Sequence, residues 1–184
     1  MTEAQLSNAM DAYGSTVYRL ALTRMQNIAD AEDVYQEVFL RLWKQAAEDW
    51  DGDRAKAWLI RTTLNRCADL HRFHLRRPVL SFAEIPDLAQ PEDESRELWE
   101  AVSRLPEKAR TAVHLYYAEG YSAEEISQLM HIPAATVRTR LHRARKQLKE
   151  LLGGIDDETC VSRSDGTNFG PQRAESVSYT HLTL

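Results

Sequence analysis

The sequence of 184 residues has few cysteines and no long apolar run. Only Cys67 and Cys160 are present, and neither lies in a C-x-x-C pair, which excludes a disulfide framework or a zinc site built by cysteines alone. No stretch approaches the roughly 18 apolar residues of a transmembrane helix, so we expect no membrane insertion. Residues 1–10 lack a basic start followed by an apolar run, so we expect no secretory signal and a cytoplasmic location.

Signals for β-strands are also missing. The chain has only 7 glycines and 6 prolines, and alternating apolar runs bounded by turn residues do not occur. With 43% hydrophobic and 28% charged residues, the composition is that of a globular protein large enough for one or two small cores. The sequence therefore predicts an all-α fold, and we expect no cofactor.

Residues 122–152 have the pattern of a helix-turn-helix. Ser122 and Glu125 match the capping box that begins a helix, and Pro133 suits the first position of the next helix. Apolar residues at helical spacing in that next helix predict a buried stripe of Val137, Leu141, Ala144 and Leu148. The residues expected to face outward are Thr136, Arg138, Thr139, Arg140, Arg143, Arg145 and Lys146.

Charge is segregated in this second helix. Residues 131–149 contain 6 Lys or Arg and no Asp or Glu, although the whole chain has a net charge of −5. A basic helix without acidic residues is typical of an element that binds phosphates. The alternative is an ordinary surface helix whose basic side chains are only solvated. The capped preceding helix and the short turn favour binding to duplex DNA.

Residues 30–44 predict an amphipathic helix with an acidic face. Its buried stripe is expected to contain Ala31, Val34, Tyr35, Val38, Phe39, Leu42 and Trp43. Its other face carries Asp30, Glu32, Asp33, Gln36, Glu37 and Arg41, with the acids near the helix start, where the helix dipole favours them. Composition alone fits an ordinary surface helix. A partner helix is expected upstream, ending between residues 25 and 28.

Residues 55–77 predict a third helix with a basic ridge. The inward stripe is expected to contain Ile60, Leu64, Cys67, Ala68, His71 and Leu75, and the opposite stripe Arg61, Asn65, Asp69, Arg72 and Arg76. Residues 54–77 hold seven Lys or Arg against one Asp, whereas residues 30–53 hold eight Asp or Glu against two Lys or Arg. The opposite net charges of these two segments predict a module that bridges a protein and a nucleic acid.

Aromatic and histidine side chains of this third helix suggest further roles. Phe73 and Trp58 could stack on unstacked bases, although inward packing is favoured for Trp58. His71 and His74 with Asp69 could ligate a metal, but no third ligand has matching spacing, so we expect no metal site.

The chain divides into four segments. Residues 78–94 contain three prolines, five acids and no Lys or Arg, which predicts an acidic flexible linker. Residues 1–77 and 95–152 are then two small helical domains, the second containing the helix-turn-helix. Residues 153–184 lack helical spacing and end in S-V-S-Y-T-H-L-T-L, a segment that looks foreign to the rest, so we expect a disordered tail.

Four segments resemble, in order and spacing, the extracytoplasmic-function sigma factors, small members of the sigma-70 family of bacterial RNA polymerase subunits. They are D-A-E-D-V-Y-Q-E-V-F-L-R-L-W, A-W-L-I-R-T-T-L-N-R-C-A-D-L, L-P-E-K-A-R, and Y-S-A-E-E-I-S-Q-L-M followed by T-V-R-T-R-L-H-R-A-R-K-Q-L. The resemblance covers about residues 9–152. It implies a subunit without catalysis of its own that binds core polymerase, reads −35 and −10 promoter elements and helps to melt DNA.

The resemblance also implies partners and sites. It places Asp30, Asp33, Gln36, Glu37 and Arg41 against the clamp of the polymerase β′ subunit, in place of the surface-helix interpretation. The β flap, promoter DNA and an anti-sigma factor are the other expected partners. For the −10 element, residues 50–54 form the preceding loop and the helix candidates are Arg61, Asn65, Arg66, Asp69, Arg72 and Arg76. For the −35 element the candidates are Thr136, Arg138, Thr139, Arg140 and Arg143.

Residues 70–75 depart from the family pattern, and two other functions are alternatives to that of a sigma factor. Residues 70–75 are less uniformly basic than in many members, so His71 and His74 could make DNA affinity depend on pH. A stand-alone helix-turn-helix repressor or activator would not need the acidic helix, and a metal-dependent hydrolase would need a bound metal. The sequence does not name the promoter, the inducing signal or the anti-sigma factor.

Overall fold

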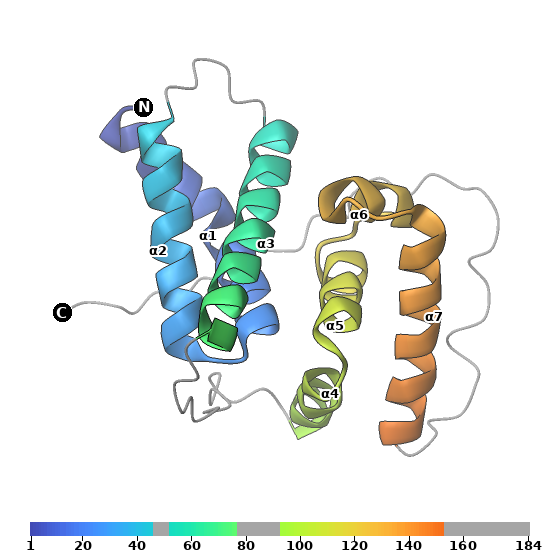
Figure 1. Ribbon diagram of the computed structural model, residues 1–184. Helices are drawn as coiled ribbons and strands as arrows, with labels where there is room; N and C mark the ends of the chain where they lie inside the picture. The colour runs from blue at the N-terminus through green and yellow to red at the C-terminus, as the bar shows by residue number, and fades with distance from the viewer. Residues whose placement is uncertain (46–51, 77–92, 153–184) are drawn as a thin grey trace.

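The computed structural model describes residues 1–45, 52–76 and 93–152, with the backbone alone at residues 53 and 93–96. Within these ranges every regular element is a helix, and the helices form two groups that stand side by side (Figure 1). The predicted all-α fold is therefore confirmed. The predicted linker falls almost wholly, and the predicted tail wholly, outside the described residues.

The first group contains α1 (Glu3–Met25), α2 (Ile28–Lys44) and α3 (Gly52–Arg76). Thr2 and Gln5 form a capping box at the start of α1, and the Asn27 side chain accepts a hydrogen bond from the Asp30 N–H at the start of α2. α1 ends at Met25, within the predicted interval. The three helices bury a common core that includes Val17, Ala21, Val34, Val38, Phe39, Leu42, Leu59, Cys67 and Leu70.

The second group contains α4 (Asp93–Ser103), α5 (Glu107–Val113), the π-helical turn η1 (His114–Ala118), α6 (Ala123–Met130) and α7 (Ala134–Leu151). Ser122 and Glu125 form the predicted capping box of α6. His131 adopts a left-handed conformation (φ 52°) that ends α6. Pro133 is the N-cap of α7, so this helix begins at Ala134, one residue later than predicted. Val137, Leu141 and Ala144 are buried as predicted, with Leu148 half-buried at the edge of the same core.

Two predicted core residues are exposed instead. Trp43 is 43% exposed and Leu75 is 83% exposed. Both lie in the last turn of their helices, where the apolar spacing continues beyond the last buried residue. The last buried residue of α2 is Leu42, and the last of α3 is Leu70.

The two groups are in direct contact. α5 packs beside α1 and α6 packs beside α3 (Figure 1). Leu20, Ile60 and Leu64 of the first group belong to the same apolar cluster as the core of the second. The hydrophobic core of the helix-turn-helix group is thus completed by side chains from α1 and α3.

Candidate nucleic-acid and protein interfaces

The outward face of α7 is a basic surface. Arg138, Thr139 and Arg143 are exposed, whereas Thr136 and Arg140 are half-buried at its edges. The buried residues Val137, Leu141 and Ala144 fix the opposite side of the helix against the core, so the basic side must face solvent. The exposed face also contains His142, which was not predicted as a contact because it is neither Lys nor Arg. Its position between Thr139 and Arg143 was the available signal.

One arginine of this face already has a partner. Arg138 donates a hydrogen bond to the Glu124 carboxylate at the start of α6. The pKa of the Glu124 carboxyl is lowered by hydrogen bonding to the backbone and to Arg138, so this side chain remains anionic. Within the described part of the chain no ion pair holds Arg140, Arg143, Arg145 or Lys146. These four side chains are therefore available to phosphates.

The predicted ridge on α3 is formed as expected. Arg61, Asn65, Asp69, Arg72 and Arg76 are all exposed. Asp69 accepts a hydrogen bond from Arg72 at 2.6 Å, so the one acid of the ridge is locally neutralised. Phe73 is 50% exposed beside this ridge, whereas Trp58 is half-buried against the first core, in line with the inward packing favoured for it. Residues 50 and 51 of the predicted loop lie outside the described residues, and residues 52–54 belong to α3, which begins three residues earlier than predicted.

Arg66 lies away from that ridge. Its side chain forms an ion pair with Glu37 of α2 and lines a hollow together with Asp33, Gln36, Leu40, Arg41 and Lys44. Glu37 also accepts a hydrogen bond from Arg41 at 2.7 Å. The structure thus brings four of the five predicted polymerase contacts together and adds Arg66 to them. Asp30 is separate, with its Oδ1 atom 3.6 Å from His74 Nε2.

An apolar groove adjoins this surface, and the sequence did not reveal it. Leu6 and Met10 of α1 face Tyr35, Phe39 and Trp43 of α2 across an open groove of about 350 Å³. Leu40, 56% exposed, lines both the groove and the neighbouring charged hollow, as does Gln36. The face formed by Asp33, Gln36, Glu37, Leu40, Arg41 and Lys44 is called the α2 face below. It combines paired charges with exposed apolar area, as protein interfaces do.

The two histidines of α3 face carboxylates of other helices. His74 is near Asp30, and His71 Nε2 lies 3.8 Å from Glu107 Oε2 of α5. Among the residues that the structure describes, no group of three His, Cys, Asp or Glu side chains is placed to hold a metal ion. Both rings point toward neighbouring helices, so the pH dependence of DNA affinity stays a prediction that the geometry does not favour. None of the described helices has the length and apolarity needed to cross a membrane.

Comparison with known families matches both helical groups. The profile of Sigma-70 region 2 matches residues 9–77, and that of Sigma-70 region 4 matches residues 95–148. The chain is 34% identical to the ECF RNA polymerase sigma factor SigE of Mycolicibacterium smegmatis over 161 residues, 82% of this chain and 62% of that protein. It is 32% identical to SigM of Bacillus subtilis, covering 79% of this chain and 94% of SigM. The chain therefore spans less than two thirds of SigE but nearly all of SigM.

Solved structures have the same fold. The sigma factor RpoE in complex with the anti-sigma factor NepR, from Bartonella quintana, matches with a TM-score of 0.69 at 23% identity, over 83% of this chain and 99% of that one. CnrH in complex with the cytosolic domain of CnrY matches with a TM-score of 0.59 at 25% identity, over 84% and 92%. With both region profiles and a relative matched over almost its whole length, this chain belongs to the sigma-70 family, as a factor of the extracytoplasmic-function group.

Proposed function

We propose that this chain binds core RNA polymerase and directs promoter-specific initiation by reading a −35 element with α7 and a −10 element with α3. The observation that carries the proposal is the separation of two kinds of surface. On α7, the side chains without an ion pair among the described residues are Arg140, Arg143, Arg145 and Lys146, whereas the α2 face presents paired charges around exposed Leu40. The first kind suits a nucleic-acid backbone and the second suits a protein.

Reading of the −35 element is assigned to the exposed side of α7. A recognition helix enters the major groove with residues near its N-terminus against base edges, and flanking cations contact phosphates. Thr139 and Arg138 are in the first two turns of α7, with His142 and Arg143 one turn further on. Arg145 and Lys146 continue along the helix and are suited to phosphate contacts.

Reading of the −10 element is assigned to the α3 ridge. Its exposed polar side chains can bind a single strand, and Phe73 offers a ring on which a base can stack, which contributes about 1–3 kcal/mol per base. Such contacts would offset the cost of unstacking bases, a few kcal/mol. Arg61, Asn65, Arg72 and Arg76 are the proposed contacts, with Asp69 positioning Arg72. Arg66 is proposed to act at the α2 face instead.

Polymerase docking is assigned to the α2 face. Charged side chains that are already paired keep their geometry, and Leu40 and Trp43 supply apolar area that polar residues alone would lack. We propose the β′ clamp as the partner of this face. For the β flap, the exposed apolar side chains Leu98 and Trp99 of α4, which packs against α7, are the proposed contact.

Control by an anti-sigma factor is also proposed. RpoE and CnrH, which share this fold, were each solved with a protein partner, and the RpoE partner NepR is an anti-sigma factor. The exposed apolar groove beside the α2 face is a surface that such an inhibitor would need to cover to block polymerase.

The function is tested by run-off transcription with bacterial core polymerase over a library of promoter sequences. We expect transcripts only when this chain is added, from templates that share two sequence elements. A stand-alone repressor would instead bind duplex DNA tightly without core polymerase and support no transcription. A metal-dependent hydrolase would be revealed by metal that co-purifies with the chain.

A further inference from the structure

The polar ridge of α3 extends to the first turn of the helix. α3 begins at Gly52, so Arg54 is part of the helix and its direction follows from helical geometry. A helix turns by about 100° per residue, which places Arg54 on the same side as Arg61 and Arg72. All three side chains are exposed. Arg54 therefore lies in line with the ridge, about 10 Å beyond Arg61 at a rise of about 1.5 Å per residue.

The first turn of α3 is weakly attached to the core beneath it. Residues 52–54 read G-D-R and have no apolar side chain. Gly52 and Arg54 are exposed, and the first residue of α3 that the structure describes as buried is Ala55. The ends of helices open most easily where few apolar contacts hold them. Core packing alone would therefore leave the backbone at Arg54 free to fray.

Tyr13 of α1 holds this turn in place. Its hydroxyl donates a hydrogen bond to the Gly52 carbonyl at 3.0 Å, although the two residues are 39 positions apart in the chain. The ring of Tyr13 is half-buried against the core of the first domain, so packing fixes the direction of the hydroxyl. The approach is close, because a Cβ atom added at Gly52 would lie 3.3 Å from the Tyr13 hydroxyl oxygen. A side chain of α1 thus fixes the position at which α3 begins.

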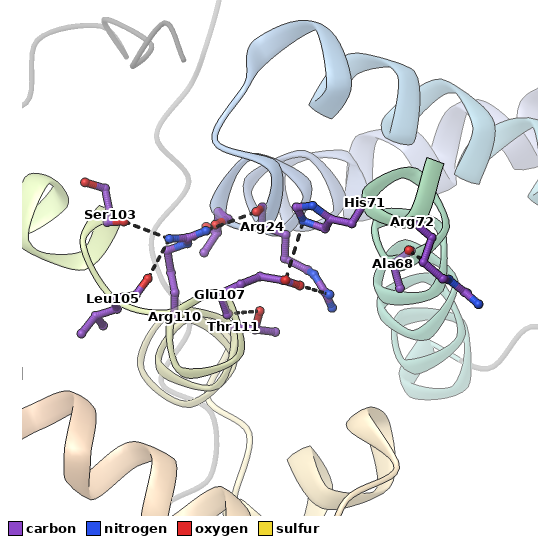
Figure 2. Close-up of polar contacts among 10 residues, drawn as sticks. Arg24, Ala68, His71, Arg72, Ser103, Leu105, Glu107, Arg110 and Thr111 are labelled. Atoms are coloured by element: carbon purple, nitrogen blue, oxygen red, sulfur yellow. Dashed lines mark hydrogen bonds and ion pairs between the residues drawn. The ribbon is translucent and has the colours of Figure 1, made fainter. Parts of the chain in front are cut away.

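The other end of the ridge is held in a different way. Arg72 donates a hydrogen bond from Nε to the Ala68 carbonyl at 3.3 Å, which Figure 2 shows, and another from Nη2 to Asp69 at 2.6 Å. Both partners belong to α3 itself, so this arginine is oriented by its own helix. Arg54 instead lies in the turn whose backbone is bonded to α1. The two ends of the ridge therefore depend on different contacts, and a change at Tyr13 should affect only the end that contains Arg54.

We propose that Arg54 binds a phosphate of the unpaired −10 strand and that Tyr13 is a positioning residue for Arg54, acting through the Gly52 carbonyl. The inference rests on the proposed function, because it adds one contact to the ridge that binds this strand. An arginine suits the role, since its guanidinium stays charged and forms paired hydrogen bonds with phosphate. Tyr13 keeps the first turn of α3 helical, so that Arg54 stays in line with Arg61.

The test measures binding of the holoenzyme to a promoter from the run-off library whose −10 region is left unpaired. Arg54→Ala should weaken binding about 3–10-fold and lower the slope of log affinity against log salt by about 0.7, the value for one phosphate contact to a single strand. Tyr13→Phe keeps the ring and removes only the hydroxyl, so it should weaken binding about 2–5-fold, within the range for one hydrogen bond. Tyr18→Phe removes a hydroxyl five residues further along α1 and should bind as the unmodified chain does.

A double variant separates positioning from general stability. If Tyr13 acts through Arg54, Tyr13→Phe should cause no further loss in the Arg54→Ala chain, so that the double variant binds as Arg54→Ala does. A hydroxyl that contributes only to the stability of the fold would instead give losses that multiply.

Hydrogen exchange of the chain alone tests the contact without polymerase or DNA. In a helix the amide of Lys56 pairs with the carbonyl of Gly52, so opening of the first turn of α3 exposes this amide to exchange. Tyr13→Phe should speed exchange of the Lys56 amide about 2–10-fold, since one hydrogen bond no longer holds the turn. Tyr18→Phe should leave the exchange rate unchanged.

The outcomes separate this inference from the proposed function. Undiminished binding by Arg54→Ala, losses that multiply in the double variant, or unchanged Lys56 exchange in Tyr13→Phe would each overturn the inference. An unmodified chain that does not bind polymerase or promoter would contradict the proposed function instead, while faster exchange in Tyr13→Phe would still establish that Tyr13 orders the start of α3.

Discussion

The charged side chains of the two domains are arranged in different ways. On the α2 face of the first domain, Glu37 pairs with Arg41 and with Arg66. In the second domain, Arg138 pairs with Glu124, but no ion pair to a described residue holds Arg140, Arg143, Arg145 or Lys146 of α7. A surface whose charges are already neutralised suits a protein partner, whereas a surface of like charge suits a phosphate backbone. Pairing, rather than charge count, distinguishes the two surfaces.

The largest effect should come from placing a charge at the centre of the α2 face. Leu40→Asp adds an anion next to Glu37 and removes exposed apolar area, so we expect core polymerase to bind about 100-fold more weakly, typical of an interface hot spot. Binding of labelled chain to core polymerase measures this. Leu75→Asp changes another exposed leucine, 83% exposed against 56% for Leu40, that lies away from the α2 face, and this variant should bind as the unmodified chain does. Equal loss of binding in both variants would contradict the assignment of polymerase docking to the α2 face.

The next effect tests the unpaired cations of α7. Arg143→Ala should weaken binding of the holoenzyme to −35 DNA by about 1–3 kcal/mol at one base position if the guanidinium reads a base edge. A loss that is uniform over all sequences, with the salt dependence reduced by about one charge, would identify a phosphate contact. Competition among base-substituted promoters at two salt concentrations separates these results. No change in either would contradict the assignment of α7 to DNA.

The stability of the folded chain should fall at low pH, because His114 is buried where the two domains meet. Burial lowers the pKa of His114 from 6.5 to about 4, against the opposing effect of nearby Glu119. As the pH falls from about 6.5 toward 4, the unfolded chain takes up a proton that the folded chain excludes, so stability is lost across that window and kept above it. From pH 7 to pH 5 the loss should be about 2 kcal/mol in urea unfolding. His114→Gln should remove this part of the pH dependence, whereas His131→Gln, at an exposed position, should not.

The smallest effect concerns Arg138, the cation of α7 that pairs with Glu124. Glu124→Gln removes the carboxylate that holds Arg138 and makes Arg138 resemble its neighbours. Affinity for −35 DNA should rise about twofold at low salt, because one negative charge near the phosphates is lost. Titration of the holoenzyme with promoter DNA at low and high salt measures it. Weaker binding would mean instead that Glu124 positions Arg138 for a specific contact.

Local structure was predictable from the sequence because its signals are local. The capping box at Ser122, the apolar spacing of α2 and α7 and the exposed ridge of α3 were all predicted correctly. At Trp43 and Leu75, beyond the last buried residue of each helix, the apolar spacing predicted burial but the side chains are exposed. Periodicity reports which side of a helix is apolar and not how far its neighbours extend.

The contacts between domains could not be predicted in this way. Arg110 reads in the sequence as one more surface cation, and only the approach of α5 to the end of α1 makes it a buried cap. Leu40 was not predicted as a contact residue, because its place beside the apolar groove depends on how α1 packs against α2. Likewise, the family resemblance placed Arg66 at the −10 element, whereas the structure pairs it with Glu37, which lies 29 residues earlier on α2.

The most direct test of the proposed division of labour is run-off transcription by core polymerase over a promoter library, with the unmodified chain and Leu40→Asp compared at equal concentration. We predict initiation from templates sharing a −35 and a −10 element with the unmodified chain, and almost none with the variant, whose α7 is intact. Initiation that is unaffected by Leu40→Asp, or an unmodified chain that joins polymerase without directing initiation at any template, would contradict this account.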